Sequence, residues 1–409
     1  MKDKKGRYEI FFVAGTSLIF ILFLYKVLIQ NSRIFDHDTT WYYGIIHYFC
    51  NSLSNASFPY WDPYDYSGQP FYYNIGITRI FEIPSLALIF LNKLFDGSFL
   101  LLYHWDFVLK IILSAVGVYL AFRQTNKYMI SNFVVFLAFL FSSFSFKAMW
   151  QCGILTTFCW TPWIFWFLLR LRKEFNFYNI AGFSLFAGLS ITSYQAGYVL
   201  TFLEVFILSL LINERRQILG ILKNKKNMLL IFWGLLIVIA LSMQAAAVFI
   251  EKDRTVPILR QITTGSQLFN DAGGGGALTP NNFIELVFPP LGIAGWYEAR
   301  LLPISECTLY IGFIPLLLVF LGLIFSRDKL KLNFAVSLFI TIFLAMGGKF
   351  KLKILGDYLF PFLAFARHMQ LFQPFLIFGF MYFVGQGMDV LIDMSRNEAP
   401  RAKARGFME

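Results

Sequence analysis

Ten apolar segments, each close to the length that crosses a lipid bilayer, constrain this chain more than any other feature. A helix needs roughly 20 apolar residues to cross the hydrocarbon core, with a range of about 17 to 25. The segments are residues 10–30, 98–122, 130–147, 153–170, 178–194, 196–213, 228–248, 309–326, 332–347 and 370–391. Because 57% of the residues are hydrophobic and only 14% are charged, a soluble fold could not hide this surface. We predict an all-α polytopic membrane protein with about ten transmembrane helices.

The basic residues gather in alternate short segments between the apolar runs. Of the 35 Lys and Arg residues, 21 lie in residues 2–7, 123–127, 170–173, 215–226, 327–331 and 396–405. Short loops rich in Lys and Arg stay in the cytoplasm, so both termini are predicted to be cytoplasmic. The net charge of +11 then reflects membrane topology, and no nucleic-acid partner is predicted.

This topology leaves three substantial loops on the outer side of the membrane. They are residues 31–97, 249–308 and 348–369. We predict a single multi-spanning domain, residues 1–395, followed by a short basic cytoplasmic tail, residues 396–409. Chemistry is expected in the outer loops.

The large first outer loop is predicted to contain two helices beside the membrane. One runs from about Thr39 to Leu53. The other, Ile80 to Phe95, contains Pro84 and Lys93 and is short for a crossing. An interfacial or re-entrant helix therefore fits this second segment better than a transmembrane one.

Two carboxylates follow the first predicted span almost at once. Asp36 and Asp38 flank His37, and in an extended segment residues i and i+2 share a face, so both carboxylates could address one ligand, metal ion or substrate hydroxyl. Alternatively, Asp38 caps the helix that begins at Thr39, a position that Asp favours. His37 could add a metal ligand, although one His beside two Asp has no supporting spacing.

A second part of the same loop is dense in aromatic residues, turn formers and carboxylates. Such rings anchor a loop at the level of the lipid headgroups. They also stack on the C–H faces of sugar rings, while neighbouring carboxylates accept sugar hydroxyls. The two interpretations are compatible, and they make candidate sugar-binding residues of Tyr60, Trp61, Asp62, Tyr64, Asp65, Gln69 and Tyr72.

Charged residues inside the apolar segments need partners, because an unpaired charge in lipid is costly. Asp106 and Lys110 are four residues apart, which is the spacing of a helical ion pair. Glu204 has no local partner in the sequence and is open to three roles: proton carrier, buried ligand group or hydrogen-bonded bundle residue.

Cations on the outer side are a further group of candidates. Basic residues are scarce there by the positive-inside rule, so they could bind an anionic ligand such as a phosphate at headgroup depth. Ordinary solvated charge is the alternative for each one. The candidates for phosphate binding are Arg254, Arg300 and Arg367.

Four stretches in a fixed order carry a resemblance to a known family. They are Asp38–Tyr43, Pro59–Phe71, Tyr310–Leu317 and Gly385–Asp389. Together they resemble the YfhO-like bacterial membrane proteins, within the GT-C superfamily of lipid-sugar-dependent glycosyltransferases. The resemblance implies a GT-C-like fold in the bacterial cytoplasmic (inner) membrane. It also implies an enzyme that transfers a sugar from a polyprenyl-phosphate donor to an extracytoplasmic glycan or lipid acceptor.

The resemblance further implies roles for individual residues. In this superfamily an acid of the first outer loop serves as base or as metal-binding acid, and Asp38 is the matching position, with Asp36 as the fallback. Polyprenyl phosphate is a good leaving group, so one base and local positive charge suffice for an inverting displacement. Cations, or a divalent metal ion such as Mg²⁺ or Mn²⁺ held by Asp36 and Asp38, would stabilise the departing phosphate. Family members are longer, so a shortened relative is expected.

Two other functions remain open at the level of the sequence. One is a transporter or flippase of lipid-linked glycans, with Glu204 and the Asp106–Lys110 pair along its path. The other is a non-catalytic relative that assists the assembly of a partner enzyme. The lipid bilayer is a partner in every case, and the sequence carries no signal for a particular oligomeric state.

Overall fold

A computed structural model shows that the chain is a mostly helical membrane protein. The structure describes residues 2–24, 38–64, 68–71, 83–94, 98–147, 152–193, 196–255, 283, 286, 309–347, 358–360, 363 and 369–405. Six helical stretches in this part of the chain are long and apolar enough to cross a membrane. They lie in α1 (Lys2–Leu24), α5 (Phe99–Phe122), α8 (Cys152–Phe158) with α9 (Thr161–Lys173), α11 (Ala196–Asn213), α13 (Lys225–Thr255) and α20 (Gln373–Arg405).

Shorter apolar helices account for the other predicted spans. These are α6 (Met129–Leu140), α10 (Phe177–Ile191), α17 (Phe313–Phe325) and α18 (Lys331–Ala345). Each of the ten predicted segments thus coincides with a helix, although two are interrupted: α6 stops before the short α7 (Ser143–Lys147), and α8 is separated from α9. The membrane character is confirmed, and ten crossings remain a prediction.

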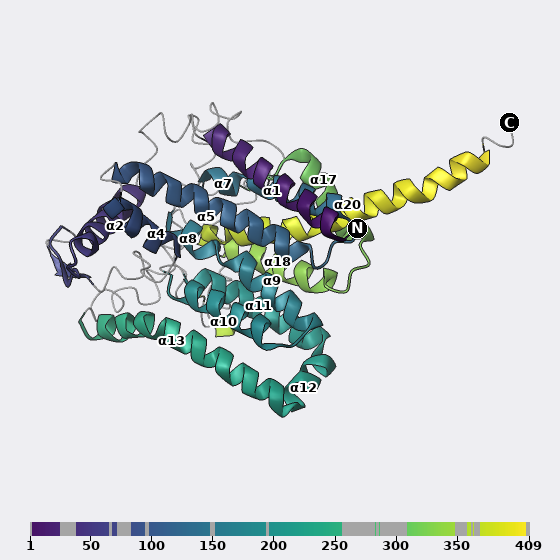
Figure 1. The fold of residues 1–409 in the computed structure, drawn as a ribbon. Coiled ribbons are helices and arrows are strands. Elements are labelled where there is room, and N and C mark those ends of the chain that lie inside the picture. The colour runs from purple at the N-terminus through teal and green to yellow at the C-terminus, as the bar shows by residue number, and fades with distance from the viewer. Residues whose placement is uncertain are drawn as a thin grey trace.

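Helix α20 lies at the centre of the bundle, and α13 lies at its edge (Figure 1). In α20, 78% of the apolar window is buried, whereas in α13 the share is 6%. Helices α17, α6, α18 and α5 pack around α20, while α13 packs on α10. Most of the Lys225–Met243 part of α13 is therefore uncovered by the described protein, as expected of a helix surface that faces lipid.

Phenylalanine rings fill the centre of the bundle. The ring of Phe378 in α20 lies 4.9 Å, between centroids, from Phe122 of α5 and also 4.9 Å from Phe165 of α9. Phe334 of α18 stacks on Tyr382 of α20 at 4.0 Å. Lipid tails are as apolar as these rings, so close ring packing, and not exclusion from water, favours the association of these helices.

Two glycines allow α17 and α20 to cross with their backbones almost in contact. A Cβ atom at Gly387 would collide with the carbonyl oxygen of Leu318, and one at Gly322 would collide with that of Phe383. Small residues at such a crossing permit the short backbone approach that van der Waals packing in membranes requires. Gly387 belongs to the Gly385–Asp389 stretch that carries the family resemblance, so this stretch has a packing role.

Asp389, from the same stretch, holds the turn between α5 and α6. Its carboxylate accepts hydrogen bonds from the backbone N–H groups of Lys127 (2.7 Å) and Tyr128 (3.1 Å) and from the Ser131 hydroxyl (2.5 Å). These donors sit at the start of α6, where backbone N–H groups lack helical partners. Asp389 therefore acts as an N-terminal cap supplied by another helix.

The α5–α6 turn and the end of α9, both of which carry basic residues, lie at the end of the bundle where both termini lie. Arg123 pairs with Glu9 at 2.7 Å, and Lys127 pairs with Asp393 at 2.7 Å. Lys173 donates to the carbonyl oxygen of Gln124 at 2.8 Å. Figure 1 shows the N- and C-termini on this side, the terminal end, with α20 continuing through the predicted tail as far as Arg405.

The crossing of α17 and α20 yields a stability prediction. Gly387→Ala should lower the free energy of unfolding by about 1 to 3 kcal/mol, the usual cost of overpacking, because the added methyl group meets backbone that cannot rotate away. The measurement is thermal unfolding of the purified protein in detergent. Gly15→Ala is the matched control, since a Cβ there has no neighbour within 4 Å; equal midpoints for the two variants would contradict the prediction.

Candidate functional site

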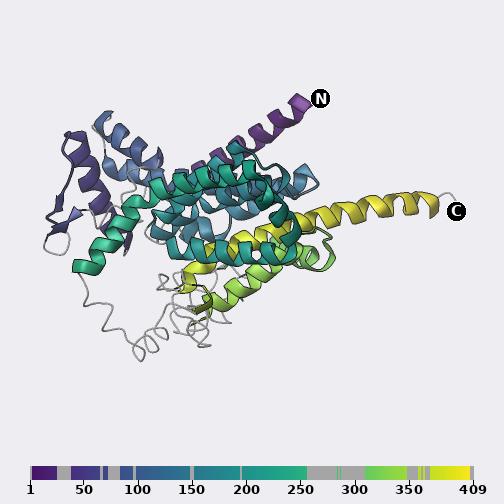
Figure 2. The same ribbon diagram turned by 90° about the horizontal axis from the view of Figure 1, so that it is seen from below.

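A small cap of secondary structure covers the end of the bundle opposite the terminal end (Figure 2). It consists of α2 (Asp38–Ser54), the strands β1 (Trp61–Asp62) and β2 (Gln69–Pro70), and α4 (Ile83–Leu94). A helix is thereby confirmed at each of the two predicted positions, while their location beside the membrane on its outer side stays a prediction. Helix α4 packs against both α2 and α5, so it joins the cap to the bundle.

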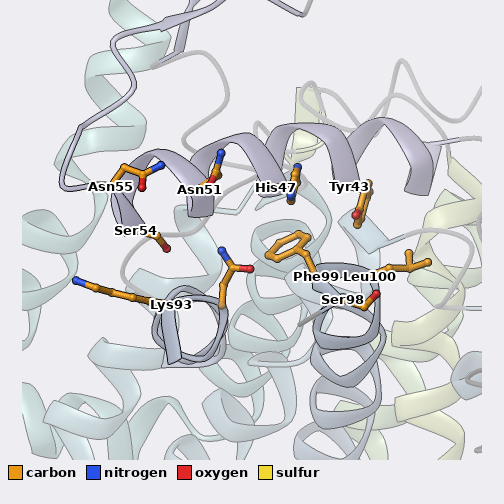
Figure 3. Close-up of a pocket in the computed structure, with 10 residues that line it drawn as sticks. Tyr43, His47, Asn51, Ser54, Asn55, Lys93, Ser98, Phe99 and Leu100 are labelled. Atoms are coloured by element: carbon orange, nitrogen blue, oxygen red, sulfur yellow. The ribbon is translucent and has the colours of Figure 1, made fainter. Parts of the chain in front are cut away.

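A cavity of about 440 Å³ lies between α2, α4 and the start of α5 (Figure 3). This volume falls within the range of small-molecule sites, roughly 300 to 1,000 Å³. Helix α2 and the residue after it contribute Tyr43, His47, Asn51, Ser54 and Asn55, α4 contributes Asn92 and Lys93, and the start of α5 contributes Ser98, Phe99 and Leu100.

Neutral hydrogen-bonding groups dominate the lining of this cavity. Asn51, Asn55 and Asn92 each offer an amide that both donates and accepts, and Lys93 adds one positive charge. No carboxylate is among the lining residues that the structure describes. Such a set matches a ligand with many hydroxyls and one anionic group.

Aromatic rings form one wall of the cavity. The imidazole of His47 lies parallel to the Tyr43 ring, with an interplanar angle of 3° and centroids 5.7 Å apart, and 4.8 Å from the ring of Phe99. Burial raises the pKa of the Tyr43 phenol above its usual value, so Tyr43 stays a neutral donor. The wall is therefore apolar on its faces and polar at its edges.

The lining residues of α2 follow the helical repeat. Tyr43, His47 and Asn51 are four residues apart and share one face of the helix. Asp38 is the first residue of α2, one residue before the predicted start. At 3.6 residues per turn, position 38 lies about 140° round the helix from position 43. Asp38 is therefore not on the face of α2 that lines the cavity.

The predicted catalytic acids remain predictions. For Asp38 the structure describes the backbone alone, and Asp36 and His37 lie outside the described residues. Within the described part of the chain, no group of three His, Cys, Asp or Glu side chains could hold a metal ion. A metal site at Asp36 and Asp38 is therefore also a prediction.

The aromatic stretch of the predicted outer loop forms a two-stranded hairpin, with Trp61 opposite Pro70 and Asp62 opposite Gln69. Asp62 is 1% exposed, and its carboxylate accepts the backbone N–H of Tyr64 at 3.0 Å. This bond within the hairpin gives Asp62 a role in the turn. The rings that face solvent are those of Tyr60, 82% exposed, and Tyr64, 81% exposed, with Trp61 half exposed beside them.

The other predicted ligand residues fall where their side chains are not described. Asp65, Tyr72, Arg300 and Arg367 lie outside the described residues. For Gln69 in β2 and Arg254 in α13, the structure describes the backbone alone. Their roles in sugar or phosphate binding remain predictions.

Sequence reasoning passed over the residues that line the cavity. His47 was not among the candidate residues, and Lys93 entered only as a reason against a membrane crossing. A signal existed in α2, because Tyr43, His47 and Asn51 put polar groups on one helical face. No pattern, however, indicated that Asn92 and Lys93 of α4 would meet that face.

A buried ion pair lies in the bundle beneath the cap. Lys110 Nζ is 2.6 Å from Asp106 Oδ2, and each side chain is 3% exposed, which confirms the predicted pairing. Within the described residues, Asp106 Oδ1 and Glu204 Oε2 have no hydrogen-bond partner. The role of Glu204 stays open.

The reactivity of Cys50 in α2 is a probe of how closely this helix packs on the bundle. Burial, together with the negative charge of Asp106, raises the pKa of its thiol to about 12. At pH 8 about one thiol in ten thousand is then ionised, against about a quarter for a thiol with the ordinary pKa near 8.5. The thiolate is the reactive form.

We therefore predict that Cys50 reacts with a maleimide at pH 8 at least about a thousandfold more slowly than an exposed thiol. The control is Ser57→Cys, because Ser57 is exposed just after α2. Labelling of each site is followed by mass spectrometry of the folded protein. Comparable rates at the two sites would show that α2 does not stay packed on the bundle.

No protein-family model matches the chain, and no curated protein or solved structure is significantly similar to it. Any functional proposal therefore rests on the residues of the cap, the cavity and the bundle themselves. The cavity is the described site with the clearest chemistry.

Proposed function

We propose that this chain is a membrane glycosyltransferase of the GT-C type, related to the YfhO-like proteins. It would transfer a sugar from a polyprenyl-phosphate donor to a glycan or lipid acceptor outside the cytoplasmic membrane, with inversion. The observation that carries the proposal is the cavity of about 440 Å³, lined by amides, hydroxyls and aromatic rings at one end of a membrane bundle.

The lining of the cavity suits a sugar bound through its hydroxyls. A sugar hydroxyl both donates and accepts, and so does a side-chain amide, so Asn51, Asn55 and Asn92 can pair with neighbouring hydroxyls whichever way these point. Lys93 would attract the phosphate of the donor.

The outer surface of α4 suits the lipid part of such a donor. Leu86, Phe90 and Leu94 are spaced four residues apart and are 50%, 65% and 60% exposed. They form an apolar stripe on the same helix that brings Lys93 to the cavity. A lipid-linked sugar needs a polar site beside an apolar track, and α4 offers both on one element.

In the proposed reaction an acceptor oxygen attacks the anomeric carbon as the bond from that carbon to the phosphate oxygen breaks. The electron pair leaves with the phosphate, and the acceptor proton passes to a carboxylate. Asp38 is the proposed base, with Asp36 as the alternative, and it would act from beside the cavity, since position 38 is not on the cavity face of α2. The usual Asp pKa, near 3.9, lies far below that of a sugar hydroxyl, so the proton can move only in the transition state. A divalent cation at these acids would neutralise the phosphate.

The proposal includes a topology of ten spans with the cap outside a bacterial cytoplasmic membrane and both termini inside. Two observations support it. The basic turns share one end of the bundle with the termini, as the ion pairs Arg123–Glu9 and Lys127–Asp393 illustrate. The helices α2 and α4, which line the polar cavity, lie at the opposite end (Figure 2).

The test is glycan and lipid analysis of a bacterial strain that lacks the chain and is complemented with defined variants. Asp38→Asn should accumulate the polyprenyl-phosphate sugar and lose the surface modification. Glu174→Gln, an exposed carboxylate at the terminal end, is the matched control and should complement fully. If Asp38→Asn and Asp36→Asn proteins are correctly inserted and glycosylate as well as wild type, the proposed mechanism is wrong.

The cavity has its own test within the same assay. Asn51→Leu combined with Asn92→Leu replaces two amides by apolar groups of similar size, so sugar binding should be lost while the bundle stays folded. We expect at least about a tenfold loss of transfer, since an unpaired polar group of the ligand costs about 1 to 3 kcal/mol. Full activity of this variant would separate the cavity from the function.

Transport of a lipid-linked glycan is the second candidate, and Glu204 is the observation that favours it. One of its carboxylate oxygens is buried without a hydrogen-bond partner among the described residues, as a proton-carrying group would be. Proton-coupled uptake that Glu204→Gln abolishes would support transport over transfer.

A further inference from the structure

Helix α12 (Arg215–Lys223) connects α11 to α13 on the side of the bundle where the termini lie (Figures 1 and 2). It is followed after one residue by the start of α13, so the two helices form a corner. Five cations at this corner are exposed: Arg215, Arg216, Lys223, Lys225 and Lys226.

The one acidic residue at this corner is already neutralised. Arg172 Nε donates to Glu214 Oε2 at 3.0 Å, and the Arg172 guanidinium pairs with the other carboxylate oxygen of Glu214 as well. Both side chains are largely buried in this contact. The five exposed cations therefore act without an opposing charge among residues 214–226.

Exposed apolar side chains accompany these cations. Leu219 is 52% and Leu222 is 44% exposed on α12. Beyond the corner, Met228 and Leu229 are 47% and 57% exposed, and they begin the surface of α13 that faces lipid. The apolar residues of α12 are thus continuous with the lipid-facing part of the bundle.

We propose that the α12–α13 corner is a binding site for anionic phospholipids. Helix α12 lies in the interface, with Leu219 and Leu222 among the acyl chains and the five cations at the level of the phosphates. A short helix with basic and apolar residues, set where a lipid-facing span begins, has the character of an interfacial helix. Basic residues at this depth are attracted to anionic headgroups.

A bilayer fits this corner better than a soluble acidic partner. The five cations alone would suit either, but Leu219 and Leu222 would stay in water beside a soluble partner. Continuity with α13, of which 6% of the apolar window is buried, places the same two leucines at the edge of the lipid. The lipid surface satisfies both the charge and the apolar area.

The test measures amide hydrogen exchange of the full chain in two kinds of nanodisc. One contains phosphatidylcholine alone, and the other contains phosphatidylglycerol in addition. With phosphatidylglycerol, exchange in residues 215–226 should slow by about tenfold or more at low salt, and the effect should shrink at high salt because the charges are screened. Equal exchange in the two nanodiscs would overturn the proposal.

Variants separate the charge of the corner from the stability of the bundle. Replacing the five cations by Gln should abolish the effect of phosphatidylglycerol, with exchange in α5 and α20 unchanged. Arg327→Gln with Lys329→Gln removes two exposed cations from the α17–α18 turn and should keep the effect. If the fivefold variant fails to fold, Arg215→Gln with Arg216→Gln should still weaken the effect, and full retention contradicts the proposal.

Inorganic phosphate is used as the last control, to distinguish a lipid headgroup from a soluble anion. Added to the phosphatidylcholine nanodiscs, it should leave exchange in residues 215–226 unchanged, because it cannot hold Leu219 and Leu222 in an apolar layer. If phosphate alone reproduces the slowing, the corner is a site for soluble anions and the lipid proposal is wrong.

Discussion

The burial of α20 is the constraint on which the rest of the described structure depends. A helix enclosed by other helices cannot expose its polar groups to water, so each of them needs a partner in the protein. Gln386 accepts from Ser326 at 2.8 Å and donates to Asn126 at 3.2 Å, while Tyr382 donates to Asp328 at 2.6 Å. These bonds fix the α5–α6 and α17–α18 turns against one central helix.

The same constraint gives the Gly385–Asp389 stretch a physical meaning. In the sequence it counted only as part of a resemblance, and its described contacts are structural: Gly387 lets α17 approach, and Asp389 caps α6. Lys127, next to that cap, pairs with Asp393, and this hydrogen bond raises the pKa of the exposed ammonium. The Gly385–Asp389 stretch therefore holds the bundle together, and its described contacts do not bear on the catalysis that we propose at the other end.

The sequence predicted most of the helices and little of the site. Segment length and hydropathy depend on local composition, so all ten apolar segments became helices, and the i, i+4 spacing was enough to pair Asp106 with Lys110. The break between α8 and α9 was missed, because Cys159 and Trp160 are apolar and continue the pattern. The cavity depends on where α4 docks on α2. This is a tertiary contact, and it produces no periodic pattern in the sequence.

The cap is joined to the bundle by a ladder of aromatic rings, whereas the polar residues that line the cavity take no part in this joint. Tyr43 lies 5.3 Å from Tyr103, which lies 4.8 Å from Phe107, so rings run from the cavity wall into α5. The polar lining residues Asn51, Asn55 and Lys93 are exposed, so changing them removes no core contact. Substitutions of these lining residues should change what the cavity can bind without changing the fold. Substitutions of Tyr103 should weaken the packing of both the cap and the bundle.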